Sequence, residues 1–84
     1  MTGHRTVVIR RATLRRAQPA PVMIREIVLW QRTDVLYELA TTTYAETDPS
    51  SATINDYAAG STRADAIATF EKAVSDARQE GFAG

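Results

Sequence analysis

The stretch that decides the fold is 22–31, VMIREIVLWQ, followed after a short polar break at 32–34 by 35–46, VLYELATTTYAE. In the second segment Val35, Tyr37 and Leu39 face one way and Leu36, Glu38 and Ala40 face the other, and this period of two is typical of a β-strand. The three-residue break leaves room only for a tight connection. The two segments therefore predict an antiparallel hairpin.

The first strand of this hairpin is apolar on both sides. One side carries Val22, Ile24, Val28 and Trp30, and the other carries Met23, Ile27 and Leu29. This pattern is typical of a central strand that is covered on both faces. We therefore take four large apolar residues of this strand as candidate interface anchors, namely Trp30, Met23, Ile27 and Leu29.

Towards the N-terminus, the β-branched residues that open 6–17 predict a further strand, and the prolines in 18–21 predict the turn after it. Two arginine pairs lie in this strand. Strict alternation places Arg10 and Arg16 on one side and Arg11 and Arg15 on the other. A flat phosphate-binding face would therefore hold only two of the four guanidinium groups.

Towards the C-terminus, the composition of 47–51, TDPSS, predicts a turn, and 53–58 is a candidate short fourth strand. Apolar residues then recur at spacings of three and four over 63–80, which predicts an amphipathic helix. Thr62 is positioned to cap its first turn. Gly81 and Phe82 match the left-handed residue and the hydrophobic contact of a Schellman ending.

These elements predict a single α+β domain over 1–84. Its sheet is an antiparallel meander of three to four strands, and one long C-terminal amphipathic helix packs on one sheet face. Because one helix covers one face, the apolar residues on the other side of 22–31 need a second cover. A partner subunit is the simplest candidate, especially since 14 of the 37 hydrophobic residues are alanine and the core is thin.

The formal net charge is zero, with ten basic and ten acidic side chains, but the charges are unevenly distributed. Residues 1–33 hold seven arginines against one acid, a net charge of +6, and 34–84 hold three bases against nine acids, a net charge of −6. The arginines of the first part can therefore pair with a nucleic-acid backbone or with the acidic second part, within one subunit or between two.

Few residues support chemistry. The chain has no cysteine, which excludes disulfides and thiolate ligands, and its one histidine, His4, lies next to the N-terminus. Glu46, Asp48 and Asp56 match no calcium-loop spacing, and no glycine-rich phosphate-binding loop occurs. We therefore predict no catalytic residue, no metal ligand and no cofactor.

The function predicted from these features is a small non-enzymatic interaction or accessory protein. It homo-oligomerises, as a dimer, or docks on a larger protein. The alternative is a small nucleic-acid-binding regulator that uses Arg10, Arg11, Arg15 and Arg16. No stretch has the length of a membrane span and no signal-peptide core is present, so the expected location is the cytoplasm, without membrane contact.

Overall fold

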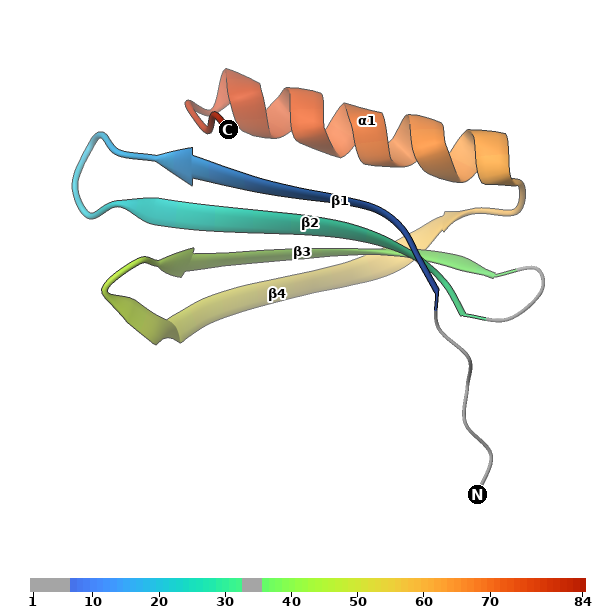
Figure 1. Cartoon of the computed structure of the whole chain (residues 1–84), viewed down its shortest axis with the longest axis horizontal. Coiled ribbons are helices and arrows are strands. Elements are labelled where there is room, and N and C mark those ends of the chain that lie inside the picture. Colours follow the sequence, from blue (N-terminus) through green and yellow to red (C-terminus); the bar gives the residue numbers. More distant parts are fainter. Residues whose placement is uncertain (1–6, 33–35) are drawn as a thin grey trace.

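The computed structural model describes residues 7–32 and 36–84. One helix, α1, runs along one face of a sheet in which each strand is hydrogen-bonded to the next in the chain (Figure 1). The elements in chain order are β1 (Val7–Arg16), β2 (Met23–Gln31), β3 (Tyr37–Ala45), β4 (Asp48–Gly60) and α1 (Arg63–Gln79).

The sheet is an antiparallel meander in the order β1-β2-β3-β4, followed by the helix. The predicted α+β class and the helix on one sheet face are therefore confirmed. The first three strands lie within the predicted ranges 6–17, 22–31 and 35–46. Thr6 and Val35, which the prediction placed in strands, lie outside the described residues.

The fourth strand exists and is longer than the predicted 53–58. β4 begins at Asp48, so the turn is confined to Glu46 and Thr47 and the wider turn predicted over 47–51 is wrong. Ser51 helps to fix this end, because its Oγ accepts a hydrogen bond from the backbone N–H of Ala45 at 3.1 Å. A proline at the second residue is tolerated because β4 is an edge strand.

The core lies between the sheet and α1. Ile27, Leu29 and Leu39, on the two middle strands, are 0 % exposed. Phe70 of α1 and Leu14 of β1 belong to the same cluster. Side chains alternate between the faces of a strand, so these residues identify the face that the helix covers and, by default, the face that it leaves open.

Both ends of α1 are capped as predicted. The Thr62 hydroxyl accepts a hydrogen bond from the backbone N–H of Asp65 at 3.1 Å. At the other end the N–H of Gly81 donates to Arg78 O and that of Phe82 to Ala77 O, both at 3.0 Å. This is the Schellman pattern, and the φ of +97° at Gly81 is the left-handed conformation that it requires.

The Schellman turn directs the last residues back onto β1. Phe82 is 2 % exposed, and Ala83 forms a backbone pair with Arg15, with N···O distances of 2.7 and 2.9 Å. This short tail lies against the outer edge of β1.

A β-bulge interrupts the other end of β1. The register with β2 shifts between Val8 and Arg10, and Ile9 packs against the core. Strict alternation along β1 would place Ile9 with Arg11, on the side away from Leu14. The structure places it on the core side instead, because the extra residue of a bulge reverses the parity of the strand.

Candidate functional site

The candidate site is the sheet face opposite α1, which we call the open face. Its residues are those that alternate with the buried core positions, and they form rows across the sheet because directly paired residues point to the same side. Three rows are complete from β1 to β4: Val8, Trp30, Glu38 and Ala58; Arg11, Val28, Ala40 and Asp56; and Thr13, Glu26, Thr42 and Ile54.

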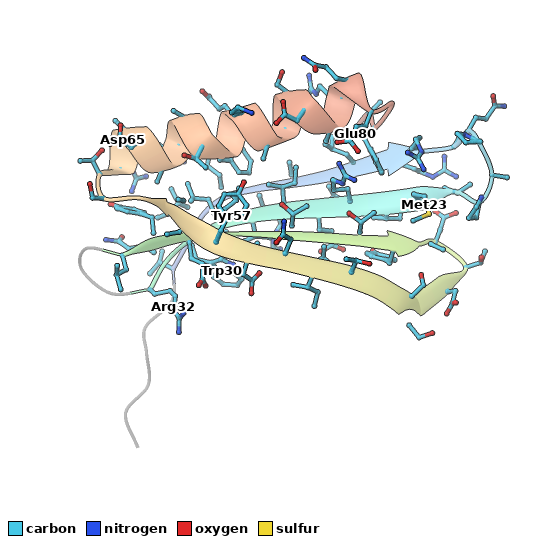
Figure 2. The ribbon with its side chains drawn as sticks, turned by 180° about the vertical axis from the view of Figure 1, so that it is seen from behind. Met23, Trp30, Arg32, Tyr57, Asp65 and Glu80 are labelled. Carbon is cyan, nitrogen blue, oxygen red and sulfur yellow. The ribbon has the colours of Figure 1, made fainter. Side chains whose placement is uncertain are left out.

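Apolar side chains are a large part of the open face. Trp30, Val28 and Ile24 of β2 are half-buried by their neighbours, although no helix covers them. Val8 is 39 % exposed and Ile54 65 % exposed on the flanking strands. Figure 2 shows Trp30 on the side of the sheet away from the helix. Exposed apolar side chains of this kind, here interspersed with charged and polar ones, are typical of an interaction surface.

Among the four candidate interface anchors, Trp30 alone lies on the open face. Ile27 and Leu29 are 0 % exposed beneath α1, and Met23 packs against the same core. The interface expectation for Met23, Ile27 and Leu29 is therefore corrected: all three lie on the face that α1 covers, where Ile27 and Leu29 are fully buried and Met23 is partly buried.

The four arginines of β1 separate into three environments. Arg11 and Arg15 lie on the open face, and Arg10 is exposed at the bulge, where its Nη1 donates to Ile9 O at 2.8 Å. Arg16 lies on the helix side. Its guanidinium carbon is 5.0 Å from the centre of the Phe82 ring, and that of Arg25 is 4.3 Å away, so both are cation–π contacts. The four do not form one phosphate-binding face.

Ion pairs connect the basic first part of the chain with the acidic second part. Arg15 pairs with Glu46 at 3.4 Å, and Arg32 pairs with Glu38 at 3.2 Å. On the helix side, Arg25 pairs with Glu80 at 3.2 Å. The charge pairing within one subunit that the sequence left open is therefore observed. Such surface pairs contribute little to stability, about 0–1 kcal/mol each.

Two charged side chains of the open face have no partner among residues 7–32 and 36–84. Glu26 accepts a hydrogen bond from the Tyr44 hydroxyl at 2.9 Å, and Arg15 and Glu38 have the ion-pair partners given above. Within the described part of the chain, Arg11 and Asp56 have no hydrogen-bond or ion-pair partner through their side chains. They occupy opposite ends of one row, about 14 Å apart at the usual strand spacing, so they cannot pair within one subunit.

The Tyr44–Glu26 contact makes a testable pH prediction. The hydrogen bond to Glu26, burial, and the negative charges of Glu26 and Glu46 raise the pKa of Tyr44 above its ordinary value of 10.0. Because the raised pKa belongs to the folded state, the stabilisation is complete below pH 10.0 and is lost as the pH rises through the folded pKa. In ultraviolet titrations of tyrosinate we expect Glu26→Gln to lower the pKa of Tyr44.

Two controls accompany this titration. Tyr44→Phe should remove the step assigned to Tyr44, whereas Tyr57→Phe, on the other sheet face, should leave it in place. An unchanged titration curve in Glu26→Gln would contradict the assignment.

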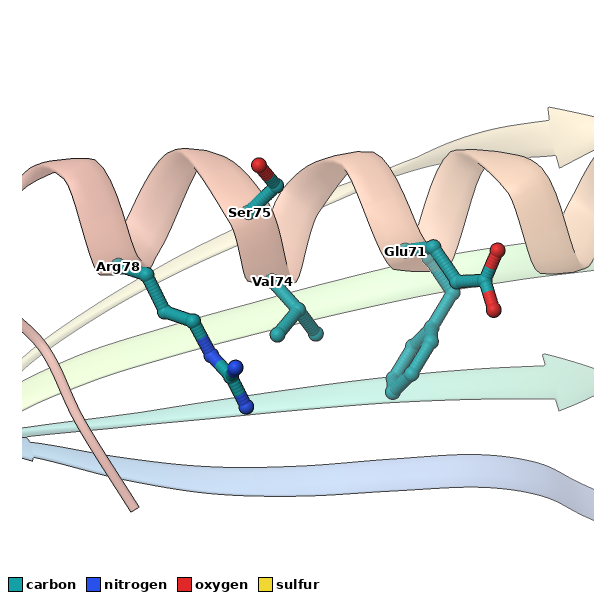
Figure 3. A pocket seen from close by; sticks show the side chains of 5 residues that line it. Glu71, Val74, Ser75 and Arg78 are labelled. Atoms are coloured by element: carbon teal, nitrogen blue, oxygen red, sulfur yellow. The ribbon is translucent and has the colours of Figure 1, made fainter.

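The surface depressions are shallow and open. The one beside α1, lined by Phe70, Val74 and Arg78 among others, has a volume of about 280 Å³ (Figure 3). A second, of about 330 Å³, lies between α1 and β4, and a third, of about 440 Å³, lies on the open face around Trp30. None of these three depressions, all in the described part of the chain, encloses a small molecule in the way that ligand pockets do.

Residues 7–32 and 36–84 contain no group of three or more His, Asp or Glu side chains placed to hold a metal ion. In those same ranges, no helix is long and apolar enough to cross a membrane. His4, the one histidine, lies outside the described residues.

Comparison of the chain with protein-family models, with curated proteins and with solved structures finds no match. The site is therefore defined by its own geometry. Sequence reasoning identified Trp30, Arg11 and Arg15, but it gave Asp56 no role on the sheet. Asp56 could have been assigned to the open face from its place in the candidate fourth strand, because it is adjacent to Tyr57 and neighbouring residues of a strand point to opposite faces.

Proposed function

We propose that this protein is a non-enzymatic interaction module that forms a homodimer through its open face. The observation that supports this proposal is a sheet with one face packed under α1 and the other left with Trp30, Val28 and Ile54 uncovered. Antiparallel sheets that stand alone in water carry polar side chains on the outer face. A second sheet of the same kind would cover these residues.

The size of the open face also supports a dimer. Four strands about 4.8 Å apart and about nine residues long form a surface of about 19 by 30 Å. Two such faces in contact bury about 1,100 Å² in total. This buried area is just above the lower limit for a specific interface, about 1,000 Å².

The proposal predicts that Val28→Asp abolishes dimerisation. Val28 lies in the middle of the open face, next to Arg11 of β1. A carboxylate there removes an apolar contact and is desolvated in the dimer, a cost that an ion pair with Arg11 offsets only in part. We expect a dimer for the unmodified protein at micromolar concentration and an increase of at least about 100-fold in its dissociation constant for Val28→Asp. Size-exclusion chromatography with light scattering measures both.

The matched control is Thr53→Asp, which adds the same charge at an exposed position on the other face of the sheet. It should dimerise normally. Circular dichroism should show the same secondary structure in both variants. A monomer in the unmodified protein across the micromolar range would refute the proposal.

The alternative function is nucleic-acid binding through β1. The exposed Arg10 and Arg11 favour it, but Glu26, Glu38 and Asp56 on the open face oppose a phosphate backbone. A salt titration of binding to single- and double-stranded DNA and RNA distinguishes the two functions. Binding at about 50 mM salt that weakens in an Arg11→Gln variant, with a monomeric protein, would favour the regulator.

A further inference from the structure

We infer that the two copies pack face to face around a two-fold axis that runs nearly parallel to the strands, so that Arg11 of each copy meets Asp56 of the other. This inference rests on the proposed homodimer and adds its geometry. It explains why these two residues carry the unpaired charges of the open face in the described part of the chain.

The geometry follows from the strand register. The two-fold axis runs along the strands, midway between the two sheets and level with the gap between β2 and β3. It places β1 of one copy over β4 of the other. Each row then faces the same row of the second copy, read in the opposite direction. The row of Arg11, Val28, Ala40 and Asp56 therefore lies face to face with the same row of the second copy, running in the opposite direction. Arg11 faces Asp56 at both ends, and Val28 faces Ala40 twice in the middle.

The spacing suits these side chains. Packed sheets lie about 10 Å apart, and the extended side chains of arginine and aspartate together span nearly that distance. Aligned sheets are also rotated by about 30°, which displaces the ends of the row by about one residue. The flexible arginine stem can follow that displacement.

The adjacent row supports the same axis. There Trp30 lies opposite Glu38 of the second copy, and the indole N–H can donate a hydrogen bond to the Glu38 carboxylate. Val8 at the end of this row lies opposite Ala58, so two apolar residues meet.

The other face-to-face arrangement is electrostatically unfavourable. A two-fold axis across the strands places β1 over β1 and β4 over β4. Arg11 and Arg15 of both copies would then lie along one edge of the interface, and the two Asp56 carboxylates would lie along the opposite edge. Like charges brought together across an interface weaken binding, so the strands-parallel axis is preferred.

Charge exchange tests this geometry. Arg11→Asp and Asp56→Arg should each weaken the homodimer, by at least tenfold in dissociation constant, because each places like charges at both ends of the row. An equimolar mixture of the two variants should dimerise as tightly as the unmodified protein, since the mixed pair has opposite charges at both ends. Sedimentation equilibrium at about 50 mM salt measures each constant.

Arg10→Asp is the matched control, because it makes the same charge change on β1 at the bulge, outside the open-face rows. It should leave the dimer within about twofold. Arg11→Gln and Asp56→Asn remove one charge without adding another and should weaken the dimer by less than the reversals. These neutral variants keep the test valid if a reversal impairs folding.

The outcomes separate the geometry from the proposed function. A monomeric unmodified protein would refute the homodimer itself. A dimer that Arg11→Asp leaves unchanged or tightens would keep the homodimer and overturn this axis. Weakening in both reversal variants without recovery in their mixture would also overturn the Arg11–Asp56 contact.

Discussion

Replacing Phe82 by alanine is expected to lower the free energy of unfolding by about 3–5 kcal/mol, which is the usual range for removing a buried aromatic ring. Phe82 lies beyond the last turn of α1, yet it is 2 % exposed and belongs to the core. Its ring also contacts the guanidinium groups of Arg16 and Arg25. The alanine variant would remove the ring from both guanidinium groups. It would also leave Arg16 Nε, which has no hydrogen-bond partner among the described residues, beside a cavity.

Urea unfolding followed by circular dichroism measures this loss. Phe82→Leu is the matched control, because it keeps most of the apolar volume and removes the aromatic face. We expect it to be less destabilising than Phe82→Ala, with the difference between them set mainly by packing. A loss below about 1 kcal/mol in Phe82→Ala would show that the C-terminal tail is not part of the cooperative core.

Leu29→Ala is expected to cost about 2–5 kcal/mol, whereas the neighbouring change Val28→Ala should cost less in the isolated subunit. The two residues are adjacent on β2 but face opposite sides of the sheet. Leu29 is 0 % exposed under α1, and Val28 is half-buried on the open face. A change at Leu29 therefore acts within each subunit, and a change at Val28 acts mainly through the proposed dimer.

Thermal unfolding over a range of protein concentrations separates these two effects. For a dimer the Tm rises with protein concentration, by mass action. Leu29→Ala should lower the Tm and keep this dependence, and Val28→Ala should reduce the dependence. If the Tm of the unmodified protein does not vary with concentration, the open face is not an interface between copies at the concentrations used.

The parts of the fold with a strong local pattern could be predicted from the sequence. The hairpin of 22–31 and 35–46 has the period of a strand, and α1 has both a helical period and capping residues at each end. β4 was harder to predict, because Pro49, Asn55 and Asp56 are poor strand formers and most of the strand is exposed. Its pairing with β3, a tertiary effect, extends it to Asp48.

The candidate site could be predicted only in part, for a similar reason. β2 is apolar on both sides, so its sequence does not indicate which side the helix covers, and Ile27 and Leu29 could not be separated from Trp30. The bulge at Val8–Arg10 leaves no clear sequence signal, yet it redirects Ile9 towards the core. The unpaired state of Arg11 and Asp56 depends on the register of all four strands.

The tail at Ala83 has a consequence for polymerisation. Its backbone pair with Arg15 occupies part of the outer edge of β1, and the bulge disrupts the hydrogen-bonding ladder at the other end of that strand. Among the described residues, β4 is therefore the edge with more of its length open to a further strand. A strand from another chain would add to β4 more readily than to the end of β1 that the tail covers.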